Sequence, residues 1–296
     1  MSGGVGAVPG RELSSGVVLL AQVTAVVSLT VGALLAVASA AGYAAGAWTS
    51  PEAVSPGLVG AAMAGVAPAL FTVGRARVWE EARTLVWPLV IVLVGLFAVS
   101  LVNGDALWVA RGGSLFLVLF SLGWVVTLGA LAAAAVLCLV LQYRRPSVRP
   151  PERVAPERLA ALPGWSKPAL AVLGSGWAGI GAGLLAVPGF WSGFVPWQVN
   201  RADAQGLGVW ALALGVGVLG ALAEDDLARL RPALLAVPSV ALAAGAVLAV
   251  HAPDVRWASG PGLSLAALLL GLLVTGVTGR WLWARAVRAA GSAREG

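Results

Sequence analysis

The sequence predicts an all-α integral membrane protein whose eight transmembrane helices form two parallel four-helix repeats. Only 11% of the 296 residues are charged and 59% are hydrophobic, whereas a soluble domain carries about 25% charged residues. The charges are clustered, and the charge-free runs between them reach the roughly 20 residues that cross a hydrocarbon core. A gapless internal match at an offset of 149 residues divides the chain into halves.

The charge-free runs define the helices in order along the chain. We expect helices near 17–40, 57–74, 84–103, 115–142, 168–188, 206–223, 233–250 and 263–280. The runs are continuously apolar and rich in Ala, Leu, Val and Gly, without the alternation of polar and apolar residues that a membrane barrel shows. Helices are therefore predicted instead of strands.

Small residues spaced four apart mark expected helix–helix contacts in the second half. These stripes are Ser175, Gly179 and Gly183, then Ala213, Gly217 and Ala221, then Gly271, Thr275 and Gly279. In the first helix, Gln22, Thr24, Ser28 and Thr30 form a modest polar track. A substrate path along this track is the sharper alternative, but such side chains mostly bond the backbone or a neighbouring helix.

The basic residues indicate the orientation of the chain. Sixteen of the nineteen fall on the side of the two termini, and only Arg111, Arg201 and Arg256 fall on the other side. Basic residues of short loops are retained in the cytoplasm, so both termini are predicted there. Arginine greatly outnumbers lysine, which together with the bias toward Ala, Gly and Val suggests a high-GC bacterial genome, so the expected location is a bacterial plasma membrane. Cleavage of a signal peptide near 38–40 is a weaker alternative, because the preceding apolar stretch exceeds a signal core.

The internal match rests on a few anchor residues. The offset of 149 aligns Trp48 with Trp197, Gly57-Leu58 with Gly206-Leu207, Asp105 with Asp254, Trp108 with Trp257 and Gly113 with Gly262. Four helices per repeat would make the repeats parallel, related by an axis along the membrane normal. We expect an N-terminal repeat at 1–142, a Pro/Arg-rich cytoplasmic linker at 143–167 and a C-terminal repeat at 168–296.

A polar cluster at the outer face is the first candidate site. His251 is the only histidine, and Asp254 follows it by three residues. Asp105 is the repeat equivalent of Asp254. Arg201 and Asp203 follow an outer loop. A membrane enzyme would need Asp105, His251 and Asp254 to converge, whereas the simpler interpretation is turn caps beside headgroup-level tryptophans. With one histidine and one cysteine, Cys138, neither a metal site nor a cofactor is expected.

The outer loop at 189–197 contains four aromatic residues. Insertion into the headgroup region is the simplest interpretation, because aromatic residues gather there. The alternative is a lid-like segment over a lipid-facing groove.

Opposite charges at equivalent positions on the inner side define a second candidate site. The offset pairs Arg75 with Glu224, Arg77 with Asp226 and Glu80 with Arg229. Residues near a two-fold axis face their equivalents, so these six residues would form an ion-pair latch between the halves. Solvated loop charges contributing about 0–1 kcal/mol per pair are the alternative.

Three features of the segment 190–260 carry a resemblance: Phe190-Trp191 and Pro196-Trp197 of the outer loop, the stretch 206–220, and the run Ala-Glu-Asp-Asp-Leu-Ala-Arg-Leu-Arg-Pro-Ala-Leu at 223–234. In these features the segment resembles uncharacterised actinobacterial multi-pass membrane proteins. The insertion Ser192-Gly193-Phe194-Val195 departs from the tighter loop of those proteins. The resemblance implies a bacterial source and carries over no function.

Function is predicted only by class. The apolar runs lack ionisable residues near their centres, which disfavours an ion-coupled pump or carrier. We therefore expect a non-enzymatic protein that binds a solute or lipid or organises partners, with an energy-independent transporter and an outer-face enzyme as alternatives. The expected partners are the lipid bilayer and a membrane protein or a second copy of the chain. Nucleic acid is not expected, because the net charge of +6 follows from the topology.

Overall fold

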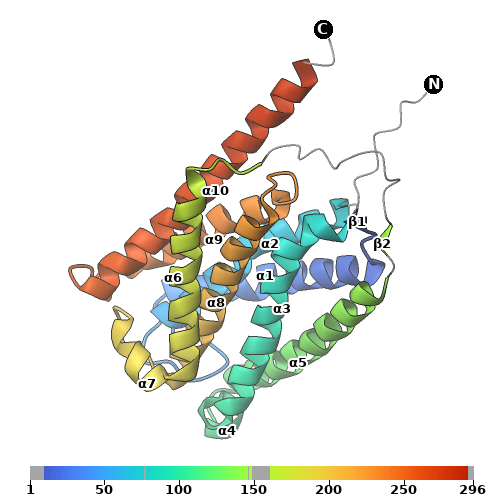
Figure 1. Ribbon diagram of the computed structural model, residues 1–296. Helices are drawn as coiled ribbons and strands as arrows, with labels where there is room; N and C mark the ends of the chain where they lie inside the picture. The colour runs from blue at the N-terminus through green and yellow to red at the C-terminus, as the bar shows by residue number, and fades with distance from the viewer. Residues whose placement is uncertain (1–9, 77, 146, 149–160, 293–296) are drawn as a thin grey trace.

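The computed structural model describes residues 10–76, 78–145, 147–148 and 161–292, and this part of the chain is an all-α membrane protein (Figure 1). Within it, eight helices are long and apolar enough to cross a membrane. They are α1 (Ser15–Ala40), α2 (Val54–Thr72), α3 (Trp79–Val102), α5 (Leu115–Arg144), α6 (Ser166–Ala186), α8 (Arg201–Glu224), α9 (Arg231–Val250) and α10 (Gly260–Ser292). The predicted all-α membrane class and the number of transmembrane helices are confirmed; the arrangement as two parallel repeats stays a prediction.

Short elements occupy the two ends of the bundle. At the terminal end, where α1 begins and α10 ends, β1 (Gly10–Arg11) pairs antiparallel with β2 (Ser147–Val148), and η1 (Val73–Arg75) follows α2. At the opposite, distal end lie η2 (Gly104–Ala106), α4 (Trp108–Arg111), α7 (Pro188–Trp191) and η3 (Ser192–Phe194). Most of the predicted linker at 143–167 falls outside the described residues.

Several helices begin earlier than their apolar runs because polar residues stabilise their first turns. α3 starts at Trp79 with Glu80 and Glu81 in its first turn, where acidic groups interact favourably with the helix dipole. α8 starts at Arg201 because the Asn200 side chain accepts a hydrogen bond from the Asp203 backbone N–H. α10 extends to Ser292, twelve residues past the predicted end.

The two halves are joined by their middle helices. Within the halves, α1 packs on α2 and α6 packs on α8, while across them α2 packs along α9 and α3 along α8. Exchanging the halves would convert the α2–α9 contact into the α8–α3 contact. This pairing is the one that a two-fold axis along the bundle requires, although the repeat itself stays a prediction. The main hydrophobic core includes residues of both halves, among them Leu96, Trp124 and Val209.

Glycines bring helix backbones into direct contact, but not along every predicted stripe. A Cβ on Gly181 would lie 2.3 Å from the backbone nitrogen of Leu212, and one on Gly215 would lie 2.4 Å from that of Ala178. Gly179, by contrast, faces open space, so the predicted stripe on α6 does not form the seam with α8. The spacing of four was a poor guide because two faces of this helix carry small residues.

The α2–α9 contact between the halves depends on Gly65. A Cβ at this position would lie 2.7 Å from the Cα atom of Val240, where only a backbone shift can make room. We expect Gly65→Ala to lower the free energy of unfolding by about 1–3 kcal/mol. In the control Gly245→Ala, on α9, the new methyl group meets nothing within 4 Å, and stability should be unchanged or slightly raised. Thermal unfolding in detergent checks both, and equal melting temperatures would contradict the close-contact role.

Candidate functional site: an apolar cavity and a distal polar seam

A cavity of about 460 Å³ lies in the distal part of the C-terminal half. Its walls come from α6, α8, α9 and α10, with a contribution from α2. The α7–η3 loop closes its distal end through the side chains of Trp191 and Phe194. The volume falls within the range of about 300–1,000 Å³ that is typical of small-molecule sites.

The cavity exists because α6 and α10 touch in their middle and separate toward the distal end. The two helices meet where Leu173 packs on Gly271 and where Leu268 packs near Gly176. Distal to this crossing, Ile180 and Leu184 of α6 line the same cavity as Leu265 of α10. α10 is also the least buried of the spanning helices. The cavity is therefore walled on one side by a helix that faces the bilayer.

The walls offer almost no polar group to an occupant. Ser264 is the only lining residue with a hydroxyl group, and the others are aliphatic or aromatic residues, glycine or proline. The indole N–H groups of Trp177 and Trp210, two wall residues, have no hydrogen-bond partner among the described residues. Apart from the Ser264 hydroxyl and these two buried indole N–H groups, the side chains of the wall offer a polar solute no replacement for its hydrogen bonds to water. The cavity suits a hydrocarbon.

The sequence identified only the loop wall of this cavity. Trp191, Phe194 and Trp197 of the 189–197 loop line the cavity, as a covering segment would, while Phe190 and Phe194 are exposed, as insertion into the headgroup region would require. Trp177 and Trp210 were missed. An isolated tryptophan in an apolar helix carries no periodic signal, and only the packing of four helices shows that the two side chains share one space.

Asp203 is the centre of a polar seam that joins the halves at the distal end. Its carboxylate is 2% exposed in the folded chain. Its Oδ1 atom accepts hydrogen bonds from Trp48 Nε1 at 2.8 Å and from Ser50 Oγ at 2.7 Å. Asn200 reinforces the contact by donating to the backbone oxygen of Thr49. The loop after α1 is thereby bound to the first turn of α8.

Two more hydrogen bonds extend this seam. Asn103 Nδ2 donates to Gln205 Oε1 at 2.8 Å, and Trp197 Nε1 donates to Ser55 Oγ at 2.9 Å. Both connect residues of opposite halves, and all four side chains are largely buried. Trp48 and Trp197, the anchors of the 149-residue match, thus each reach the first turn of a helix in the other half.

His251 is placed between a serine and an aspartate. Its Nε2 atom lies 2.9 Å from Ser39 Oγ, and its Nδ1 atom lies 3.1 Å from Asp254 Oδ2. The order of groups matches that of a nucleophile, a base and an orienting acid. However, Ser39 is fully buried, its hydroxyl donates to the Ala53 carbonyl, and a Cβ on Gly57 would overlap its Oγ atom. The serine is thus enclosed by packed groups of α1 and α2, and its contact with His251 holds α1 to the end of α9.

The predicted outer-face cluster therefore divides into separate parts. His251 and Asp254 contact each other, and Asp203 belongs to the seam with Trp48. Asp105 is exposed and joins neither group among the described residues; its backbone oxygen accepts from Arg111 Nε. Arg201 is an exposed residue at the start of α8. Among the described residues, no group of three His, Cys, Asp or Glu side chains is arranged to hold a metal ion.

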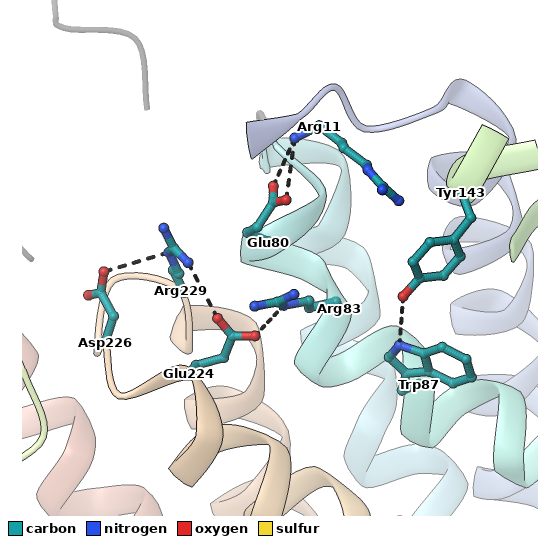
Figure 2. A network of polar contacts seen from close by, with 8 residues as sticks. All are labelled: Arg11, Glu80, Arg83, Trp87, Tyr143, Glu224, Asp226 and Arg229. Carbon is teal, nitrogen blue, oxygen red and sulfur yellow. Dashed lines mark hydrogen bonds and ion pairs between the residues drawn. The ribbon is translucent and has the colours of Figure 1, made fainter. Parts of the chain in front are cut away.

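At the terminal end, Glu224 is the acid that meets a basic residue of the other half (Figure 2). Its side chain is 6% exposed and forms ion pairs with Arg83 of α3 and, at 3.5 Å, with Arg229. Arg229 also lies 3.7 Å from Asp226. The partner from the first half is thus Arg83 of α3, in place of the predicted Arg75. Arg83 reaches Glu224 because α3 packs along α8.

The remaining members of the proposed latch lie elsewhere. Glu80 accepts hydrogen bonds from the backbone N–H of Arg11, as Figure 2 shows, and so binds β1 to α3. Arg75 forms no ion pair with a described residue and lines a separate cavity. Arg77 lies outside the described residues. Three of the six residues, Glu224, Asp226 and Arg229, share one network.

The segment 190–260 supplies the loop wall of the cavity together with its α8 and α9 walls. No family model, curated protein or solved structure matches the chain.

Proposed function

We propose that this chain is a non-enzymatic membrane protein that binds the hydrocarbon chain of a lipid in the cavity of its C-terminal half. The observation that supports it is the composition of the wall, which is apolar except for Ser264. Lipid chains are the most abundant apolar molecules beside α10, the least buried spanning helix. Binding would fill the cavity with dispersion contacts between the lipid chain and the apolar side chains of the wall.

The location that fits this proposal is a bacterial plasma membrane, with both termini in the cytoplasm. The asymmetry of basic residues between the two ends supports this orientation. The terminal end would then face the cytoplasm, and the lipid-binding cavity would lie toward the outer leaflet.

The two alternative functions, a carrier and an enzyme, each need access for a solute that the described residues provide less well than the apolar cavity does. A carrier would need a solute path through the middle of the bundle between the halves, where the space lined by Thr84 and Trp210 measures about 60 Å³. That is far below the range of about 300–1,000 Å³ that is typical of small-molecule sites. An enzyme would need access to Ser39 and His251, which are buried.

Filling the cavity should abolish lipid binding. Ala244 is a buried wall residue of α9, whereas Ala246 is exposed on the same helix. We expect Ala244→Trp to reduce labelling of the peptide around Trp177 and Ala178 at least five-fold when the protein is irradiated in nanodiscs with a phosphatidylcholine carrying a diazirine on its acyl chain. The control Ala246→Trp should leave that labelling unchanged.

Peptide mapping by mass spectrometry distinguishes the cavity from the outer surface. Exposed Leu270 of α10 should be labelled in all variants, since it faces lipid in any case. Labelling confined to such exposed positions, or equal labelling of the wall in both tryptophan variants, would contradict the proposal.

A further inference from the structure

A second cavity, of about 410 Å³, lies at the terminal end between the two halves. Three helical segments each contribute an arginine to its wall. Arg75 comes from η1, Arg231 from the start of α9 and Arg280 from α10. Glu81 of α3 is the acidic residue of the wall, which leaves two net positive charges facing one space.

These arginines differ from their neighbours because none of them forms an ion pair with a carboxylate of the described residues. Arg83 and Arg229, at the same end of the bundle, pair with Glu224. Among the described residues, no ion pair involves Arg75, Arg231 or Arg280; Arg231 instead lies over the ring of Trp283 at 5.7 Å from its centroid. Guanidinium groups stay protonated at any physiological pH and match phosphate oxygens in geometry. Three such groups around one cavity present positive charge and N–H donors to an anion.

The rest of the wall is apolar. Pro232, Leu234, Leu235 and Trp283 line the cavity beside the arginines. A small inorganic anion would leave this surface without a partner. A molecule with a phosphate at one end and a hydrocarbon at the other would contact both kinds of wall.

The depth of the cavity in the bundle fits the position of a lipid headgroup. Arg280 follows Gly260, the first residue of α10, by twenty residues, which corresponds to about 30 Å of helix. That is about the thickness of the hydrocarbon core of a bilayer. Exposed Trp281 lies next to Arg280 in the chain, and the Cζ atom of Arg285 lies 3.7 Å from the centroid of its ring. Tryptophan gathers at the level of the headgroups, so Trp281 indicates that level for Arg280 as well.

We propose that this cavity binds the phosphate headgroup of an anionic phospholipid, with Arg75, Arg231 and Arg280 holding the phosphate and Leu235 and Trp283 contacting the glycerol and upper acyl chain. Basic pockets between transmembrane helices bind anionic lipids in this way. Because the site draws on η1 and α3 of one half and α9 and α10 of the other, the bound lipid bridges the halves. The proposal is independent of the lipid-chain cavity at the distal end.

The test is a titration of the purified, delipidated protein in a neutral detergent. The probes are dioctanoylphosphatidylglycerol, dioctanoylphosphatidylcholine and inorganic phosphate, and binding is measured by calorimetry. We expect the triple variant Arg75→Gln/Arg231→Gln/Arg280→Gln to weaken binding of the phosphatidylglycerol at least ten-fold. The control Arg144→Gln/Arg285→Gln/Arg288→Gln removes the same charge from exposed arginines at the same end and should change the affinity less than two-fold.

The probes separate the sources of the phosphate. Tight binding of phosphatidylglycerol with weak binding of phosphatidylcholine and of inorganic phosphate supports the proposal. If inorganic phosphate binds as tightly and competes, the cavity is a site for soluble phosphates and the lipid proposal is wrong. Equal losses in the two triple variants would show general charge attraction, and absence of phosphatidylglycerol binding would exclude the site; both overturn it. Circular dichroism and gel filtration verify that the variants fold.

Discussion

Asp203→Ala should lower the free energy of unfolding by about 3 kcal/mol, the largest effect that we expect of a single substitution at the distal end. The substitution removes the acceptor of two hydrogen bonds from the other half, and leaves Trp48 Nε1 buried without a partner. Unfolding of the purified protein by titration with sodium dodecyl sulfate measures the change.

Two comparisons make this result specific to the seam. Asp203→Asn keeps an oxygen in the place of Oδ1 and should cost less, about 1 kcal/mol. Asp105→Ala removes a carboxylate that is exposed at the same end and should leave stability within about 0.5 kcal/mol of the original. A loss at Asp203 no larger than that at Asp105 would show that the seam does not hold the halves together.

Glu224→Gln should be the corresponding lesion at the terminal end, with a loss of about 2 kcal/mol. Glu224 is nearly buried between Arg83 and Arg229, so removing its charge leaves two arginines facing each other. The half-exposed Arg83 can turn toward water; Arg83→Gln should therefore cost less, about 1 kcal/mol.

The pairing is established by a double-mutant cycle. The double variant Arg83→Gln/Glu224→Gln should lose less stability than the sum of the two single losses, with a coupling of about 1 kcal/mol. Arg75→Gln serves as the control, because the 149-residue offset pairs Arg75 with Glu224 whereas the structure does not. It should show no coupling to Glu224→Gln. Additive losses at Arg83, or coupling at Arg75, would overturn the assignment of Arg83 as the partner.

Much of the fold could be predicted because the bilayer imposes a simple rule. Charges are excluded from its centre, so charge-free runs of sufficient length mark the helices. The ends were less accurate, since α8 begins at Arg201 and α10 continues to Ser292. Capping by Asn200 allows α8 to begin within polar residues that a hydropathy pattern assigns to a loop. Basic side chains near the end of α10 can extend into water, so the helix continues beyond its apolar run.

The candidate sites were predicted unevenly. His251 and Asp254 are three residues apart, and the turn that follows α9 brings them together. The contact of Asp203 with Trp48 spans 155 positions and the contact of Glu224 with Arg83 spans 141. The 149-residue offset placed Glu224 at the interface between the halves but paired it with Arg75 instead of Arg83. A fixed offset does not describe how α3 lies against α8, and that packing determines which arginine reaches Glu224.

Local composition by itself determined that this protein is a bundle of eight membrane-spanning helices with one basic end, because burial in lipid depends on the character of each successive segment. Only the tertiary structure decided which polar residues meet and where space remains. The apolar cavity arises where α6 and α10 separate beyond Leu173 and Gly271. The arginine cavity arises where η1, the start of α3 and the start of α9 meet the side of α10. Both depend on crossing angles set by side-chain packing between helices distant in the chain.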